Sequence, residues 1–189
     1  MTALWRLKGG LLRLLAPLLF AEVGRGAMVA GRLRLPTGRG AVRIGAGALL
    51  GDSVFFQAGR GAEIAVGAGV TLNTGTHLVA ARGIRVGEGT AVGEYVSIRD
   101  AEHRFAPETG VRGQGFDAAP VEIGARCWIG RGAYLGPGTR IGAGSIVAAN
   151  AVVRGRFGPG LLIAGAPATA RRRIAPGGAR LPLHPIAAE

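Results

Sequence analysis

The sequence predicts an all-β fold, a solenoid in which short strands stack in successive coils. Two observations lead to this prediction: aliphatic residues recur every six positions over most of the chain, and glycine makes up 35 of the 189 residues. Six is a multiple of the two-residue period of a strand, so the recurring side chains point to one face; it does not match a helical period. The glycine content also disfavours a helical bundle, because each interior glycine costs about 1 kcal/mol relative to alanine. The length fits one domain.

The segment 4–20 (LWRLKGGLLRLLAPLLF) precedes the repeats and predicts one or two short amphipathic helices. The most apolar stretch, 11–23, has 13 residues, is interrupted by Arg13 and Pro17, and falls short of the ~20 residues that cross a bilayer. We therefore expect residues 1–24 to form a helical part that either caps the solenoid or lies on a membrane surface as a peripheral contact. The single cysteine excludes an intrachain disulfide and favours a cytoplasmic location.

The six-residue spacing then defines the coils. Its clearest run is Ile123, Ile129, Leu135, Ile141, Val147 and Val153, and small residues follow the first five by four positions, at Cys127, Ala133, Thr139, Ser145 and Ala151. The same phase appears earlier at Ile44, Leu50 and Phe56, at Val66, Leu72, Leu78 and Ile84, and at Val86, Val92 and Ile98. One short strand cannot bury its apolar face alone, whereas stacked coils bury a continuous column.

One long insertion, 99–120 (RDAEHRFAPETGVRGQGFDAAP), interrupts the phase, and long loops in compact repeats are usually functional. It contains His103, one of three histidines, and histidine suits general-base chemistry because its ordinary pKa lies near neutrality. The alternative is a surface histidine without a catalytic task. His77 is expected on the outer face of a coil, since it precedes the inward Leu78, and His184 lies in a proline-flanked tail and is expected to be non-catalytic.

The formal charge is +12, and no acidic residue occurs from 123 to 188, where nine arginines are found. Such a basic half suggests an anionic partner, namely a phosphorylated ligand, a nucleic acid or an acidic membrane; the alternative is a solvated basic face. Few aromatic residues interleave with the arginines and no nucleic-acid motif is evident, so we expect no nucleic acid.

The run VEIGARCWIGRGAYLGPGTRIGAGSIVAANAVV (121–153) resembles the hexapeptide-repeat acyltransferases, and the resemblance extends over roughly 40–174. It implies a left-handed parallel β-helix of triangular section over 25–174, with an irregular tail over 175–189. It also implies a homotrimer with its sites between adjacent subunits.

The stretch SIRDAEHRF is similar to the sugar O-acetyltransferase branch, which includes galactoside and maltose acetyltransferases. This resemblance implies that His103 takes the proton from an acceptor hydroxyl, and a "WIG" segment follows here with Trp128 25 residues later. Asp100, or alternatively Glu102, would orient the imidazole, although both suit solvated loop charges. Asn73 would contact the acceptor, or else be a turn asparagine. Trp128 would wall the acetyl or acceptor pocket, or else be an outward tryptophan on a coil.

The segment IAGAPATARRRI (163–174) resembles the family segment beside which coenzyme A lies. Gly165 and Pro167 match it, and Arg172 falls where a basic residue commonly contacts the coenzyme's phosphates; arginine pairs with phosphate bidentately. Ala149 matches a small residue that lets the pantetheine arm approach the coil. Arg154, which stands where threonine is frequent, is a further cofactor-binding candidate. The alternative is that the three arginines 171–173 form a solvated tail.

The resemblance, with these residues, implies an enzyme that moves an acetyl group from acetyl-CoA, a co-substrate, to a hydroxyl of a sugar in a polysaccharide or glycolipid, with no metal. The alternatives are N-acetylation of an amino sugar and a non-catalytic solenoid scaffold. A γ-type carbonic anhydrase is disfavoured, because it needs three zinc-ligating histidines. The loop has no second histidine, since position 108, five residues after His103, is Glu. A covalent acyl-cysteine route is also disfavoured, because Cys127 occupies a small inward position where a thiol is inert.

Overall fold

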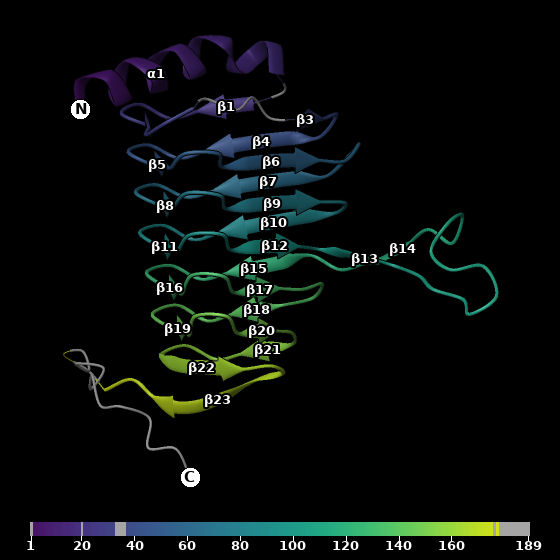
Figure 1. Ribbon diagram of the computed structural model, residues 1–189. Coiled ribbons are helices and arrows are strands. Elements are labelled where there is room, and N and C mark those ends of the chain that lie inside the picture. Colours follow the sequence, from purple (N-terminus) through teal and green to yellow (C-terminus); the bar gives the residue numbers. More distant parts are fainter. Residues whose placement is uncertain (1, 20, 33–36, 176, 178–189) are drawn as a thin grey trace.

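The computed structural model describes residues 2–19, 21–32, 37–175 and 177, and over them the chain forms a three-sided parallel β-solenoid (Figure 1). Successive strands go in turn to three sheets, which we name A, B and C, so each sheet receives one strand from each complete coil. All pairings between coils are parallel, as in β4 with β7 and β10 with β15. The predicted hexapeptide-repeat β-solenoid is confirmed.

Sheet A contains β1 (Ala21–Val23), β4 (Ala41–Ile44), β7 (Glu63–Val66), β10 (Gly83–Val86), β15 (Val121–Ile123), β18 (Arg140–Ile141) and β21 (Arg156–Phe157). Sheet B contains β2 (Met28–Val29), β5 (Leu49–Leu50), β8 (Thr71–Leu72), β11 (Ala91–Val92), β16 (Trp128–Ile129), β19 (Ile146–Val147), β22 (Leu161–Gly165) and β23 (Ala168–Arg173). Sheet C contains β3 (Thr37–Gly38), β6 (Phe55–Ala58), β9 (His77–Ala80), β12 (Ser97–Arg99), β17 (Tyr134–Leu135) and β20 (Val152–Val153).

The core is the column of aliphatic side chains that the six-residue phase predicts. Each of those positions, from Ile44 to Val153, is at most 4% exposed, and the small positions after them are buried as well. Register explains this continuity: Ile84 pairs with Ile64 in the coil before it and with Val121 in the coil after it. The inserted loop therefore leaves the stack uninterrupted, since the chain returns to the same column after it.

Tight corners separate the three sheets, and the coils touch there backbone to backbone. At Gly130, a Cβ atom would lie 2.5 Å from the amide nitrogen of Ala149 in the next coil, so only glycine fits this stacking. Among the residues that the structure describes, four other than glycine adopt a positive φ of 54–57°; they are Ser53, Tyr95, Arg126 and Asn150. The corner at Gly130 thus brings residues nineteen positions apart into contact.

Helix α1 (Thr2–Leu15) and the 3₁₀ helix η1 (Ala16–Leu19) cover the open end of the first coil (Figure 1). Leu12 and Ala16 join the hydrophobic core. The solenoid begins at β1, a few residues before the boundary predicted at 25, because Ala21 and Val23 already pair with Val42 and Ile44. In the described part of the chain, no helix has the length and hydropathy needed to cross a membrane.

Parallel stacking ends at β22, earlier than the boundary predicted at 174. The chain reverses after Gly165, whose φ is +109°, and β23 returns antiparallel to β22. The end of the predicted 25–174 solenoid, β23, is therefore the second strand of a hairpin that extends sheet B. The tail 175–189, including His184, lies outside the described residues except for 175 and 177.

Candidate active site

The insertion forms a hairpin that projects from the solenoid (Figure 1) and carries His103 near its base. Strand β13 (Ala101–His103) pairs antiparallel with β14 (Phe116–Ala118), so His103 lies opposite Phe116. The two rings meet edge to face with centroids 5.1 Å apart. The imidazole is exposed and lines a cavity of about 360 Å³ with Phe116, Arg99 and Val79. A ring held this way is available to a ligand.

Asp100 fixes the base of this hairpin. Its carboxylate is fully buried and accepts hydrogen bonds from the backbone N–H groups of Ala81, Arg82 and Gly83, at 2.6–2.7 Å. Its backbone carbonyl accepts the N–H of Ala119, where the loop returns. Among the described residues no hydrogen bond joins Asp100 to His103. The structure thus gives Asp100 a different task from the predicted orientation of the imidazole.

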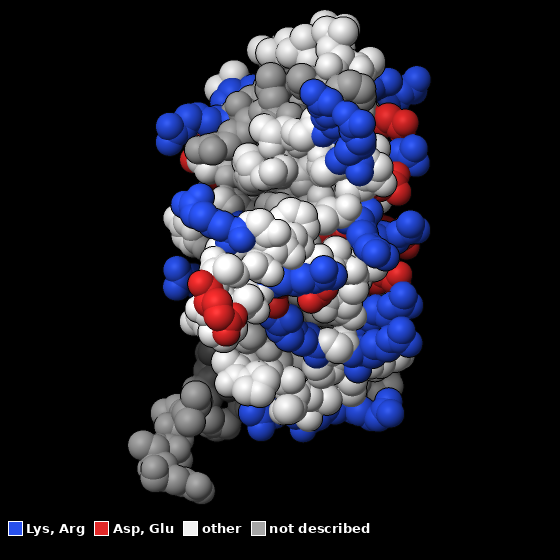
Figure 2. All heavy atoms as spheres, turned by 90° about the vertical axis from the view of Figure 1, so that its right-hand side faces the viewer, with Lys and Arg blue, Asp and Glu red and all other residues white. Residues whose placement is uncertain are grey.

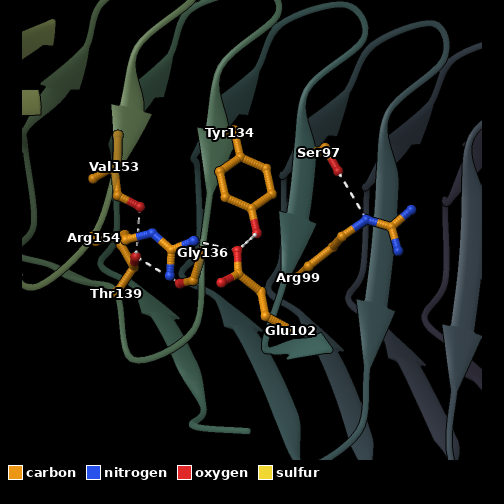
Figure 3. Close-up of polar contacts among 8 residues, drawn as sticks. All are labelled: Ser97, Arg99, Glu102, Tyr134, Gly136, Thr139, Val153 and Arg154. Carbon is orange, nitrogen blue, oxygen red and sulfur yellow. Dashed lines mark hydrogen bonds and ion pairs between the residues drawn. The ribbon is translucent and has the colours of Figure 1, made fainter. Parts of the chain in front are cut away.

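Glu102 belongs to a cluster on the outer face of sheet C (Figure 3). Its Oε1 accepts a hydrogen bond from the Tyr134 hydroxyl at 2.8 Å and another from the Arg154 guanidinium, which also lies 5.9 Å from the Tyr134 ring centroid. The Arg154 bond, followed by the Tyr134 bond, lowers the pKa of Glu102 below its ordinary 4.5. Burial, with a smaller effect of Glu102, raises the pKa of Tyr134. This cluster fastens β13 to coils that follow the loop.

A second candidate region is a groove of about 500 Å³ along sheet B and its corner with sheet C. It brings together three of the predicted site residues, Asn73, Trp128 and Ala149, with Leu162 as a further apolar wall. Trp128 is half exposed, and the amide of Asn73 donates to the carbonyl of Val92 at 3.0 Å. Small residues line much of the groove, so a narrow, extended ligand can approach the backbone there.

The predicted cofactor residues divide between two places. Gly165, Pro167 and Arg172 lie on the β22–β23 hairpin, which continues the sheet that holds the groove, and Arg172 pairs in register with the groove residue Leu162. Arg154 follows β20 on sheet C and is engaged by Glu102. Within one chain Arg154 is therefore separated from the other candidates.

His103 and the groove lie at different corners of one chain. The loop joins sheet C to sheet A, whereas Asn73 and Ala149 lie in turns that join sheet B to sheet C. The molecule seen from the loop side carries more Lys and Arg than Asp and Glu (Figure 2). The loop cavities themselves include Arg99 and Arg112.

Cys127 and His77 have structural positions. Cys127 is buried, its thiol donates to the carbonyl of Gly142 at 3.3 Å, and burial raises its pKa above 9.0. His77 is exposed on β9, with Thr76 buried beside it, and packs on Phe55 at 5.3 Å between centroids. Within the described chain, no group of three or more metal-ligating side chains gathers at one place.

Two residues that contact His103 or Glu102 were not predicted from the sequence, Phe116 and Tyr134. Phe116 supports the imidazole and Tyr134 binds Glu102. The sequence could have indicated Tyr134, because it is an outward aromatic residue on the coil directly after the insertion. It could not have indicated Phe116, because the partner of that residue depends on the register of the hairpin.

Comparisons with known proteins agree with this architecture. Residues 120–155 match the family model for the bacterial transferase hexapeptide (six repeats). Over 77 residues the chain is 35% identical to nodulation protein L from Rhizobium leguminosarum bv. viciae; the match spans 41% of this chain and 40% of that protein.

Solved structures give the same fold. An N-acyltransferase from Bacillus cereus, AntD, in complex with dTDP-4-amino-4,6-dideoxyglucose and coenzyme A, has a TM-score of 0.65 at 16% identity and covers 79% of this chain and 81% of its own. A hexapeptide-repeat acetyltransferase from Vibrio cholerae O1 biovar eltor, with acetyl coenzyme A, has a TM-score of 0.57 at 20% identity over 90% and 87%. Galactoside acetyltransferase with coenzyme A gives 0.54 at 18% over 90% and 81%. The predicted resemblance to hexapeptide-repeat acyltransferases is confirmed.

Proposed function

We propose that the protein is an acetyltransferase that moves an acetyl group from acetyl-CoA to a hydroxyl of a sugar unit in a polysaccharide or glycolipid. The observation that carries the proposal is the imidazole of His103, exposed on a braced hairpin and lining a cavity. The likeness to nodulation protein L and to acyltransferase structures that hold coenzyme A supports the class.

We assign the donor to the groove on sheet B. Ala149 and its neighbours leave room for the pantetheine arm, while Trp128 and Leu162 offer apolar walls to the acetyl end. Arg172, with Gly165 and Pro167, would meet the phosphates at the end of this sheet, since arginine binds phosphate bidentately. Asn73 would contact the acceptor from the corner of the groove.

His103 acts as the general base. It takes the proton from the acceptor hydroxyl as that oxygen attacks the thioester carbonyl, and backbone N–H groups stabilise the tetrahedral oxyanion. The C–S bond then breaks, CoA leaves as the thiolate, and the imidazolium returns its proton to the sulfur. Asp100 serves as a positioning residue that holds the loop, and Arg154 serves through Glu102 rather than through the donor.

The complete site requires more than one chain. Loop and groove lie at different corners of one solenoid, so a homotrimer that sets the loop corner of one subunit against the groove corner of its neighbour joins them. This arrangement matches the one that the family resemblance implies.

A thiol-release assay with acetyl-CoA and a panel of sugars and amino sugars tests the activity. We expect release with hydroxyl acceptors and a 10²–10⁴-fold loss, roughly, in His103→Ala, with unchanged thermal unfolding. Full activity in that variant would remove His103 from the reaction. Release only with amino sugars would assign N-acetylation instead. Failure to bind acetyl-CoA at all would favour a scaffold.

Coexpression of two impaired variants tests the shared site. At acetyl-CoA concentrations well below the wild-type KM, we expect His103→Ala and Ala149→Trp chains, each with little activity alone, to regain about a quarter of wild-type activity when coexpressed, because a random quarter of interfaces then joins an intact loop to an intact groove. Mixtures without activity would place both halves of the site in one chain.

A further inference from the structure

Helix α1, continued by η1, presents to the outside an apolar surface that no described residue covers. Five leucines, spaced three and four positions apart along 4–18, are 49–78% exposed; they are Leu4, Leu7, Leu11, Leu14 and Leu18. Among the described residues these are five of the eleven large hydrophobic side chains that are exposed. The top of the molecule in Figure 2, where α1 lies, accordingly shows a mostly uncharged surface. We call these five residues the leucine stripe.

The helix cannot turn this stripe inward, because its opposite side is already docked. Leu12 and Ala16 are buried in the core, and Gly9 lies against the carbonyl of Ala27 so closely that no Cβ would fit. Lys8 donates a hydrogen bond to the carbonyl of Gly31. The core thus holds one face of α1, and the leucine stripe remains outside.

The charges beside the stripe favour an anionic partner. Arg6 and Arg13, seven residues apart and so on the same side of the helix, line a groove of about 460 Å³ between α1 and the first coil, together with glycines such as Gly10 and Gly26. No acidic residue precedes Glu22 in the sequence. Two copies meeting stripe to stripe would therefore bring like charges together, whereas anionic headgroups would complement them.

We propose that α1 docks the protein on an anionic phospholipid surface. The leucine stripe enters the boundary between headgroups and acyl chains, and Arg6 and Arg13 contact lipid phosphates at the level of the groove. Amphipathic helices with an apolar face and basic flanks bind membranes in this way. The proposal is independent of the acetyl-transfer reaction.

Sedimentation of the full chain with vesicles tests it. We expect binding to phosphatidylcholine vesicles that contain phosphatidylglycerol, weaker binding to pure phosphatidylcholine, and loss with added salt. The double variant Leu7→Glu/Leu14→Glu should lose binding at least tenfold with unchanged circular dichroism, since both side chains are exposed. Arg6→Gln and Arg13→Gln should each weaken binding about fivefold.

The matched control is Arg60→Gln/Arg85→Gln, which removes two exposed charges away from the helix and should bind like wild type. Wild-type protein that stays in the supernatant, or a leucine variant that still sediments, would overturn the proposal. So would a higher solution mass in lipid-free buffer that the leucine variant abolishes, since the stripe would then join two copies.

Discussion

The Asp100→Asn variant probes what holds the loop that carries His103. The native carboxylate accepts three buried N–H groups, with Ala81 on Oδ1 and with Arg82 and Gly83 on Oδ2. An asparagine has the same shape but only one acceptor oxygen. In the better orientation of this side chain, the amide oxygen keeps the hydrogen bonds from the N–H groups of Arg82 and Gly83, and the NH₂ group faces the N–H of Ala81.

The cost follows from this geometry. The orphaned N–H of Ala81 costs about 1–3 kcal/mol, and each remaining bond weakens by about 1 kcal/mol because its acceptor is no longer charged. The total loss in the free energy of unfolding is about 3–5 kcal/mol per chain. For a chain of this size it corresponds to a fall in melting temperature of roughly 6–20 °C.

Thermal unfolding and the pH dependence of kcat together form the assay. Asp117→Asn is the matched control, because this carboxylate lies on the same hairpin, is largely exposed and pairs with Arg104, so its loss should cost less than about 1 kcal/mol. As a loop holder, Asp100 should leave the pH midpoint of kcat unchanged when it is replaced. A melting temperature within about 2 °C of wild type, or a shifted pH midpoint, would refute the reasoning.

Three further predictions follow from other parts of the molecule. Ala149→Trp fills the groove from an exposed position and should raise KM for acetyl-CoA at least tenfold, roughly, without lowering thermal stability; an unchanged KM would move the donor elsewhere. Glu102→Gln should destabilise the protein by about 1 kcal/mol or less at pH 7, since the ion pair is nearly half exposed. Folding lowers the pKa of Glu102 below 4.5. The difference in unfolding midpoint between wild type and Glu102→Gln should therefore persist above that pH and vanish as the pH falls through the folded pKa. A difference that grows in acid would contradict this. Cys127→Ala should keep thiol-release activity, and native Cys127 should resist iodoacetamide, because burial raises the pKa of its thiol; rapid alkylation with loss of activity would contradict both.

The fold was predictable because the core depends on a single periodicity. Ile129 and Val147 occupy the same column in successive coils, so their spacing alone indicated burial. The boundaries of the solenoid were harder to predict from the sequence. Ala21 and Val23 are only two in-phase residues, and the reversal at Gly165 converts what looks like another coil into a hairpin.

The site was predictable only in part, because loop contacts depend on which coils stack. The insertion and its histidine stand out in the sequence. The partners of Asp100 lie 17–19 residues earlier and those of Glu102 lie 32 and 52 residues later, so stacking alone brings them together. Side-chain roles that look equivalent in the segment DAEH are therefore separated by the direction in which each residue points: Asp100 into the coil and Glu102 along sheet C.

The alternation of inward and outward side chains along each strand also explains why assembly and activity are linked in our proposal. A triangular solenoid directs its apolar side chains inward, so polar functional groups gather at corners and on outer faces. In this chain the hairpin with His103 projects from one corner, and the apolar groove runs along another. A rigid column cannot fold one corner onto the next, because every coil is fixed by the coils beside it. In our proposal a neighbouring copy brings the two together, and one interface, repeated by symmetry, then creates every site at once.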